Sequence, residues 1–203
     1  MNTGFIGGIV GSINTEVEIS NCYNNGTITA GGQCSGGIAG SFKAGTIVKC
    51  YNIGKVEAKA KAKPTSRGIA GGIVAANQGG TISEVYNSEN VTIGLNTQAT
   101  NNNAGGGIVG VQTAGSIEKA YNKGNILGEG ETKGAVVGQK TGGELSKTYF
   151  YSQINNASIN GIGTTTSSKD INTQLSPVST AEGEVESTTA NYTSLNDFLK
   201  NIQ

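Results

Sequence analysis

The 203-residue sequence contains no histidine and no tryptophan, and it has only two prolines and three cysteines. Histidine is the most frequent general acid or base in enzymes, so its absence leaves acid–base chemistry to paired carboxylates. The chain has two aspartates, Asp170 and Asp197, and both lie in its last fifth. We therefore expect a protein that is not an enzyme and that needs no cofactor.

The cysteines Cys22, Cys34 and Cys50 are odd in number and form no CxxC pair, which argues against a disulfide framework or a zinc site. No run of residues approaches the ~18 apolar residues of a membrane span, so we expect no membrane insertion. The formal charge is zero, from 14 basic and 14 acidic residues. Nucleic acid is therefore not an expected partner, because it attracts proteins mainly through excess positive charge.

Glycine, in contrast, is abundant at 33 residues, and it opens a phrase that returns five times. The clearest copy, from Gly36 to Val56, reads GGIAGSFKAGTIVKCYNIGKV. The five opening glycines are Gly7, Gly36, Gly71, Gly106 and Gly134, and the five tyrosines are Tyr23, Tyr51, Tyr86, Tyr121 and Tyr149. The tyrosines are 28, 35, 35 and 28 residues apart. A phrase that recurs every ~20–50 residues indicates a stacked repeat architecture.

Alignment of the repeats gives columns of similar residues. An apolar column consists of Ile19, Ile47, Ile82, Ile117 and Leu145. Three positions later stands a small residue, Cys22, Cys50, Val85, Ala120 or Thr148, directly before the tyrosine. A spacing of three breaks the alternation of a straight strand, whereas the many glycines and β-branched residues oppose a helix. We therefore predict a corner between two short strands, with both columns pointing inward.

The pattern predicts an all-β fold, a right-handed parallel β-solenoid of about five coils. We expect strands at the opening phrase GGIVG, at the Ile and Tyr columns, and after the tyrosine, for example at Lys55-Val56. Stacked coils then turn the Ile and Tyr columns into ladders. Two insertions, 57–67 and 93–104, follow this last strand in neighbouring repeats and are expected to project from one corner.

The repeats occupy residues 1–154, and residues 155–203 form a second region. Ser, Thr and Asn predominate over 155–190 without an apolar period, which predicts irregular chain. Leu195, Phe198, Leu199 and Ile202 follow Ser194 with the spacing of an apolar helical stripe. We expect a short helix over 194–202 that acts as a cap, docked on the open end or on the side of the last coils, because a solenoid must cover its exposed end.

The phrase GGIVG…GGTISEVYN…NV closely resembles the GLUG motif, and the resemblance covers residues 4–154. Departures are Ala75, Ala135 and Phe150, which replace two motif glycines and the ladder asparagine. The family is found as a repeat in large bacterial surface proteins, including adhesins and some immunoglobulin A1-cleaving metallopeptidases. The resemblance implies an extracellular or cell-surface scaffold with no catalytic or metal-binding residues.

We therefore expect a non-catalytic segment of a longer bacterial protein, serving as a stalk or as an adhesive surface for a host or cell-surface protein or glycan. Two alternatives remain: the non-catalytic repeat region of a secreted metallopeptidase, and a carbohydrate-binding module. The candidate binding residues are Lys59, Lys61 and Lys63, which suit either a protected sheet edge or a patch for an anionic surface. The tyrosine column suits either structural stacking or an aromatic platform for sugars. Glutamates spaced by two, such as Glu16 and Glu18, suit either solvated edge charges or a calcium site.

Overall fold

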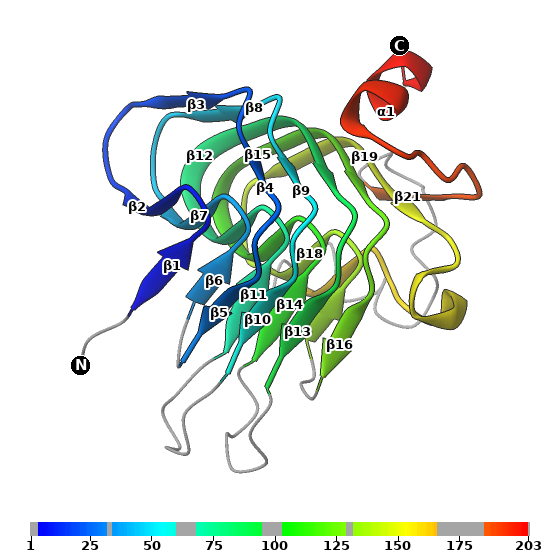
Figure 1. Ribbon diagram of the computed structural model, residues 1–203, viewed down its shortest axis with the longest axis horizontal. Helices are drawn as coiled ribbons and strands as arrows, with labels where there is room; N and C mark the ends of the chain where they lie inside the picture. The colour runs from blue at the N-terminus through cyan, green and yellow to red at the C-terminus, as the bar shows by residue number, and fades with distance from the viewer. Residues whose placement is uncertain are drawn as a thin grey trace.

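The computed structural model describes residues 4–31, 34–59, 68–94, 103–128, 132–165 and 185–202. Among these residues the fold is all-β with parallel strand pairing, plus one short α-helix and one 3₁₀ turn. Equivalent strands of successive repeats lie one behind another, so the chain follows the same path many times (Figure 1). This arrangement is compatible with a parallel β-solenoid.

Three parallel sheets run through the described residues, and each takes equivalent strands from successive repeats. The first contains β1 (Phe5–Gly7), β6 (Cys34–Gly36), β11 (Ile69–Gly71), β14 (Ala104–Gly106) and β17 (Thr132–Gly134). The second contains β5 (Ile28–Ala30), β10 (Val56–Ala58), β13 (Val91–Ile93) and β16 (Ile126–Gly128). In the second sheet Ala58 pairs with Ile93, so the two predicted insertions begin at adjacent strand ends. Their central parts lie outside the described residues.

The third sheet is the largest, because in some repeats two or three short strands merge into one. Its first part contains β2 (Val10–Ile13), β7 (Ala39–Phe42), β12 (Val74–Asn87), β15 (Val109–Asn122), β18 (Val137–Lys140) and β20 (Ile162–Thr165). Its second part contains β3 (Glu18–Ser20), β4 (Tyr23–Asn24), β8 (Thr46–Val48), β9 (Tyr51–Asn52), β19 (Glu144–Tyr151) and β21 (Val185–Thr188).

The two apolar columns of the alignment meet in the core on either side of a bend. In the second repeat Ile47 and Cys50 are both fully buried, although only two residues separate them. Lys49 between them has a left-handed backbone with φ of 53°. The equivalent residues Asn21, Glu84, Lys119 and Lys147 share this conformation, with φ of 54°, 53°, 49° and 47°. The predicted corner is therefore a single left-handed residue in each repeat, which turns the chain enough to point both columns inward.

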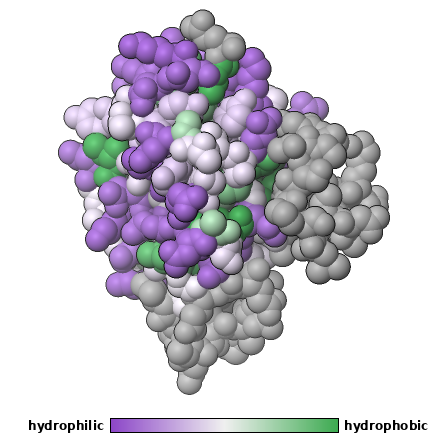
Figure 2. Space-filling view, turned by 90° about the vertical axis from the view of Figure 1, so that its right-hand side faces the viewer, coloured by the Kyte–Doolittle hydropathy of each residue, from purple (hydrophilic) through white to green (hydrophobic). Residues whose placement is uncertain are grey.

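The Ile column is a continuous ladder in the core: Ile19 pairs with Ile47, Ile47 with Ile82, Ile82 with Ile117, and Ile117 with Leu145. The three central isoleucines are fully buried in one cluster. The side face of the molecule in Figure 2 is mostly hydrophilic, with hydrophobic residues in small separate patches. This distribution follows from the inward direction of the apolar columns.

The opening phrase GGIVG is not the single strand expected from the sequence. β1 ends on the first glycine of the phrase, Gly7, and β2 begins only at Val10, so the phrase spans a bend. The second glycine of the phrase lies within this bend, and a Cβ added there at Gly37 would overlap the carbonyl oxygen of Gly72 and the side chain of Asn52. The position requires glycine for close approach between neighbouring repeats.

A buried ladder of asparagines follows the tyrosine column. Asn24 Nδ2 donates to Asn52 Oδ1 at 2.7 Å, Asn52 to Asn87 at 2.8 Å, and Asn87 to Asn122 at 2.8 Å. Asn122 Nδ2 ends the series on the carbonyl oxygen of Ala135 at 2.8 Å. Each of these amides therefore satisfies its neighbour across a repeat boundary, as buried polar groups require.

The prediction of irregular chain over 155–190 is wrong for two segments. β20 pairs with β18 and β21 pairs with β19, both parallel, so the third sheet continues beyond the last repeat. A 3₁₀ turn, η1 (Ile154–Ala157), precedes them. Ile162 and Val185 are the sole large apolar residues of their strands. These strands form by pairing with an existing sheet edge. They therefore need no alternating apolar residues, and the sequence shows no apolar period there.

The predicted helix is α1 (Leu195–Asn201). Ser194 Oγ accepts a hydrogen bond from the Asp197 amide at 3.1 Å, as expected of an N-cap. Asp197 Oδ2 accepts from the Thr193 amide at 2.8 Å, one residue earlier than in a standard capping box. Of the two docking places considered, the helix takes the side, outside the stacked strands (Figure 1). The strands β20 and β21, and not the helix, continue over the end of the last repeat.

The Ile ladder predicts a large stability loss on truncation. Ile82→Ala should lower the free energy of unfolding by about 2–5 kcal/mol, because the cavity lies between two paired neighbours. Thr81→Ala is the matched control, since Thr81 is exposed one residue away. Chemical denaturation measures both. A loss below about 0.5 kcal/mol for Ile82→Ala would contradict its burial, because that is the size expected of surface changes.

The asparagine ladder makes a second prediction. Asn87→Ala removes the hydrogen-bond partner of both Asn52 Nδ2 and Asn122 Oδ1. The free energy of unfolding should fall by about 1–3 kcal/mol for each buried group that loses a hydrogen bond. Asn24→Ala is the control, because Asn24 stands at the end of the ladder and bonds one ladder neighbour. Denaturation should show the larger loss for Asn87→Ala. Equal losses would mean that the amides do not act as a ladder.

Candidate binding groove

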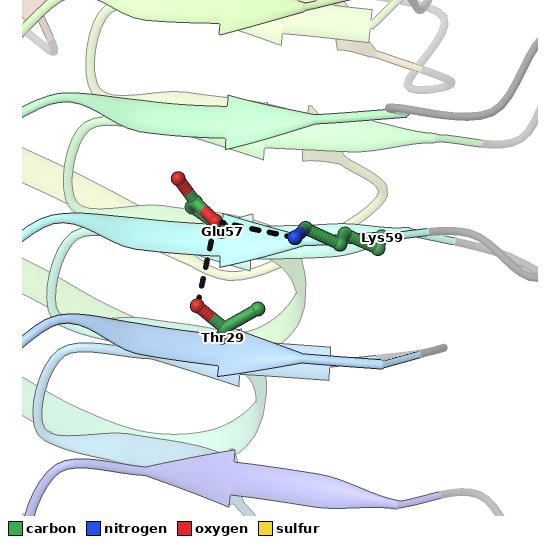
Figure 3. A network of polar contacts seen from close by, with 3 residues as sticks. All are labelled: Thr29, Glu57 and Lys59. Atoms are coloured by element: carbon green, nitrogen blue, oxygen red, sulfur yellow. Dashed lines mark hydrogen bonds and ion pairs between the residues drawn. The ribbon is translucent and has the colours of Figure 1, made fainter.

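The predicted lysine patch is described only at Lys59, since Lys61 and Lys63 lie outside the described residues. Lys59 Nζ is 3.9 Å from Glu57 Oε2, and the side chains are 51% and 28% exposed. Thr29 Oγ1, on the neighbouring strand, donates to the same carboxylate oxygen at 3.4 Å. Figure 3 shows Lys59 reaching back along its own strand toward Glu57. An exposed pair of this kind contributes about 0–1 kcal/mol and leaves the Lys59 charge partly compensated.

The tyrosines form a column in register, with Tyr51 paired to Tyr23 and Tyr86, and Tyr121 paired to Tyr86 and Tyr149. Their environments differ along the column. Tyr86 and Tyr121 are 1% and 0% exposed, whereas Tyr23 is 53% exposed. Tyr23 and Tyr51 stack with ring centroids 5.1 Å apart and planes 5° apart. One half of the column is therefore a covered core, and the other half is open.

The C-terminal segment covers the buried half. Phe198 stacks on Tyr121 at 5.4 Å and meets Tyr149 edge-on at 6.0 Å. Leu195 and Phe198 are buried in one cluster with Tyr86 and Tyr121. The hydroxyl of Tyr86 donates to the carbonyl oxygen of Tyr192 at 3.1 Å, and that of Tyr121 to Ala190 at 2.8 Å. The tyrosine row therefore binds both an extended strip and an amphipathic helix of the same chain.

A groove of about 880 Å³ lies between this segment and the corners of the repeats. It is lined by the left-handed corner column, by part of the tyrosine column and by one face of the C-terminal segment: Asn21, Lys49, Tyr51, Ile53, Glu84, Tyr86, Lys119, Lys147, Thr193, Ser194, Leu195, Asn196, Leu199 and Ile202. The groove thus combines an apolar floor with polar and charged walls, as ligand sites commonly do.

The corner residues give the groove a positive charge. Lys119 Nζ is 3.6 Å from Glu84 Oε1, so these two charges pair. Lys49 and Lys147 are exposed, and no carboxylate of a described residue pairs with either. A left-handed backbone costs a non-glycine residue roughly 1–2 kcal/mol, yet every repeat keeps a polar side chain at this corner. Among these side chains, Lys119 and Glu84 pair across neighbouring repeats, and Lys49 and Lys147 are left to face solvent.

The corner column was not among the binding residues expected from the sequence. The signal was present, because the five residues directly precede the small column and three of them are lysines. The other wall of the groove could not be predicted, since it depends on where residues 193–202 dock. Ile53, which lines the groove and is 43% exposed, also gave no separate signal.

Cys22 and Cys50 are free thiols, the first half-buried and the second buried, and Cys34 is buried as well. Burial raises the pKa of the Cys50 thiol to about 11. Within the described ranges, no group of three or more His, Cys, Asp or Glu side chains is arranged to hold a metal ion. Within the same ranges, no helix has the length and apolar content needed to cross a membrane.

Burial also raises the pKa of Tyr86 to about 12, and it raises the pKa values of Tyr121 and Tyr149. These neutral phenols stabilise the fold fully below the unfolded tyrosine pKa of about 10, and the stabilisation falls as pH rises through the folded pKa values.

Phe198→Ala should remove the side chain that covers the tyrosine rings, so that the tyrosines ionise at lower pH. Absorbance titration measures this shift.

Lys200→Ala is the matched control for the titration, because Lys200 lies on the exposed face of the same helix. It should leave the titration curve of the tyrosines unchanged. An unchanged curve for Phe198→Ala, in a protein with intact circular dichroism, would show that the helix does not shield the tyrosines.

Comparison with models of known protein families, with curated proteins and with solved structures gives no match. The functional assignment therefore rests on the groove, on the repeat columns and on the motif in the sequence.

Proposed function

We propose that this protein is a non-catalytic repeat segment of a bacterial cell-surface or secreted protein of the GLUG-motif type, and that it presents an adhesive surface on a rigid stalk. In this proposal residues 4–154 form a right-handed parallel solenoid of five coils. The hand follows the general preference of parallel strand crossovers. Further domains of a longer parent chain supply its attachment to the cell.

One observation carries the proposal: equivalent residues of successive repeats pair in register along the whole array. Such an array gives a stiff scaffold in which each repeat contacts only its neighbours, and it offers an extended side face for binding. The apolar columns that recur in each repeat serve packing, and the polar corners beside them face the groove. A scaffold with a laterally placed binding groove fits an adhesive segment better than an enzyme.

The binding surface in this proposal is the groove together with Tyr23, Tyr51 and Ile53. The ligand of the adhesive surface is a host or cell-surface protein or a glycan. The alternative is that the same scaffold is the non-catalytic repeat region of a secreted metallopeptidase. A catalytic domain elsewhere in the parent gene would identify that alternative. Lys59 is a weaker candidate than the groove lysines because Glu57 compensates part of its charge.

Surface display tests the adhesive role. The chain is displayed on a non-adherent bacterium, and retention on cultured host cells is counted against the bare carrier. The wild-type chain should increase retention, and the double variant Tyr23→Ser with Ile53→Lys should reduce it, because both side chains are exposed at the open half of the column. Lys43→Ala is the control, because Lys43 is exposed and does not line the groove. Retention equal to that of the bare carrier would refute an adhesive role.

A further inference from the structure

The tyrosine column already binds one peptide, which is the C-terminal segment of its own chain. Two carbonyl oxygens of an extended strip, those of Ala190 and Tyr192, accept from the hydroxyls of Tyr121 and Tyr86. The strip leads into α1, which packs Phe198 on the rings. The recognition elements are therefore a row of hydroxyl donors at the spacing of paired strands and an apolar surface beside it.

The same row continues unoccupied for two repeats. Tyr23 and Tyr51 hold the equivalent register positions, and no described residue accepts a hydrogen bond from either hydroxyl. Ile53, 43% exposed, adds apolar surface next to them. This surface is continuous with the α1 interface through the groove, whose walls include Tyr51, Leu199 and Ile202.

We propose that Tyr23, Tyr51 and the adjoining groove bind a peptide segment of a partner protein that resembles the chain's own tail. The segment has an extended strip whose carbonyls accept from the two tyrosine hydroxyls, followed by a short helix with a Leu or Phe stripe that packs on Ile53 and the groove. An acidic residue of the segment faces Lys49. This inference rests on the proposed adhesive function and names the chemistry of its ligand.

The groove charge supports an acidic segment. Lys49 and Lys147 are unpaired with any described carboxylate, and Lys119 is paired with Glu84. A peptide with excess negative charge therefore gains attraction at Lys49 and Lys147 without displacing an existing ion pair.

The ring geometry favours a peptide over a sugar. Sugars bind aromatic side chains through the ring faces, and the stack of Tyr23 on Tyr51, with planes 5° apart, takes one face of each ring. The ring edges and hydroxyls remain, and these suit carbonyl acceptors and aliphatic side chains. The strands that carry Tyr51 and precede Lys49, β9 and β8, are already paired on both sides, so at these strands the segment contacts side chains of the groove and does not add as a strand.

A synthetic peptide that copies residues 190–202 tests the proposal on the full chain. Isotope-labelled protein is titrated with the peptide, and chemical shifts locate the site. We expect saturable binding, with shifts at Tyr23, Tyr51 and Ile53. Ile53→Lys should weaken binding by about tenfold, which corresponds to the loss of one good apolar contact. Circular dichroism of the variant verifies its fold.

Charge is tested with a second peptide in which Lys200 is replaced by Glu. This peptide should bind tighter than the first, and Lys49→Asn should abolish the difference. Asparagine is the chosen replacement because it tolerates the left-handed backbone at this corner. A control peptide with serine in place of Leu195, Phe198 and Leu199 should not bind.

Four results would overturn the inference. The first is absence of binding at millimolar peptide, and the second is equal binding of the serine control. The third is chemical shifts confined to Tyr121 and Tyr149, which would mean that the peptide replaces α1 on the buried tyrosines. The fourth is binding of an acidic oligosaccharide at the groove while the peptide fails. If the peptide does not bind but displayed chains still retain bacteria on host cells, the proposed adhesive function is supported and the proposed peptide ligand is wrong.

Discussion

Backbone hydrogen bonds between equivalent strands hold the repeats in register, and the position of nearly every side chain follows from them. Because each residue pairs with its equivalent in the next repeat, a preference at one position is multiplied along the array. Isoleucine becomes a continuous core, tyrosine becomes a column, and asparagine becomes a hydrogen-bonded ladder. A slip by one residue would turn the isoleucines outward and leave the buried amides without acceptors, so the apolar and polar ladders specify the same register.

The candidate binding surface arises where this regularity is interrupted. The repeats alone give every tyrosine a similar setting, but the C-terminal segment covers only part of the column. Its docking converts a uniform face into a buried half, an open half and a groove between them. The corner lysines belong to the repeats, whereas the opposite wall belongs to residues 193–202. The candidate site therefore depends on contacts between residues more than 100 positions apart in sequence, such as Tyr86 with Tyr192.

The parts of the structure that could be predicted are those that repeat. The spacing of three between Ile47 and Cys50 indicated a corner, and Lys49 forms it. The bend at Gly8 could not be predicted from the phrase alone, because the reason for glycine is the backbone of the next repeat. The strands β20 and β21 were missed because an existing sheet edge, and not an apolar pattern, selects them. The apolar stripe predicted α1, but the surface on which the helix packs cannot be predicted from the stripe.

The asparagine ladder runs in one direction. Each amide nitrogen points to the next repeat, and the last one, on Asn122, ends on a backbone carbonyl where Ala135 stands in place of the motif glycine. The hydrogen bonds of the ladder thus all have the same direction along the array, and the series ends at its C-terminal side. Gene duplication of one internal repeat would insert a unit that donates to its successor and accepts from its predecessor, leaving the terminator unchanged. Arrays of this design can lengthen in evolution without any new sequence at their ends.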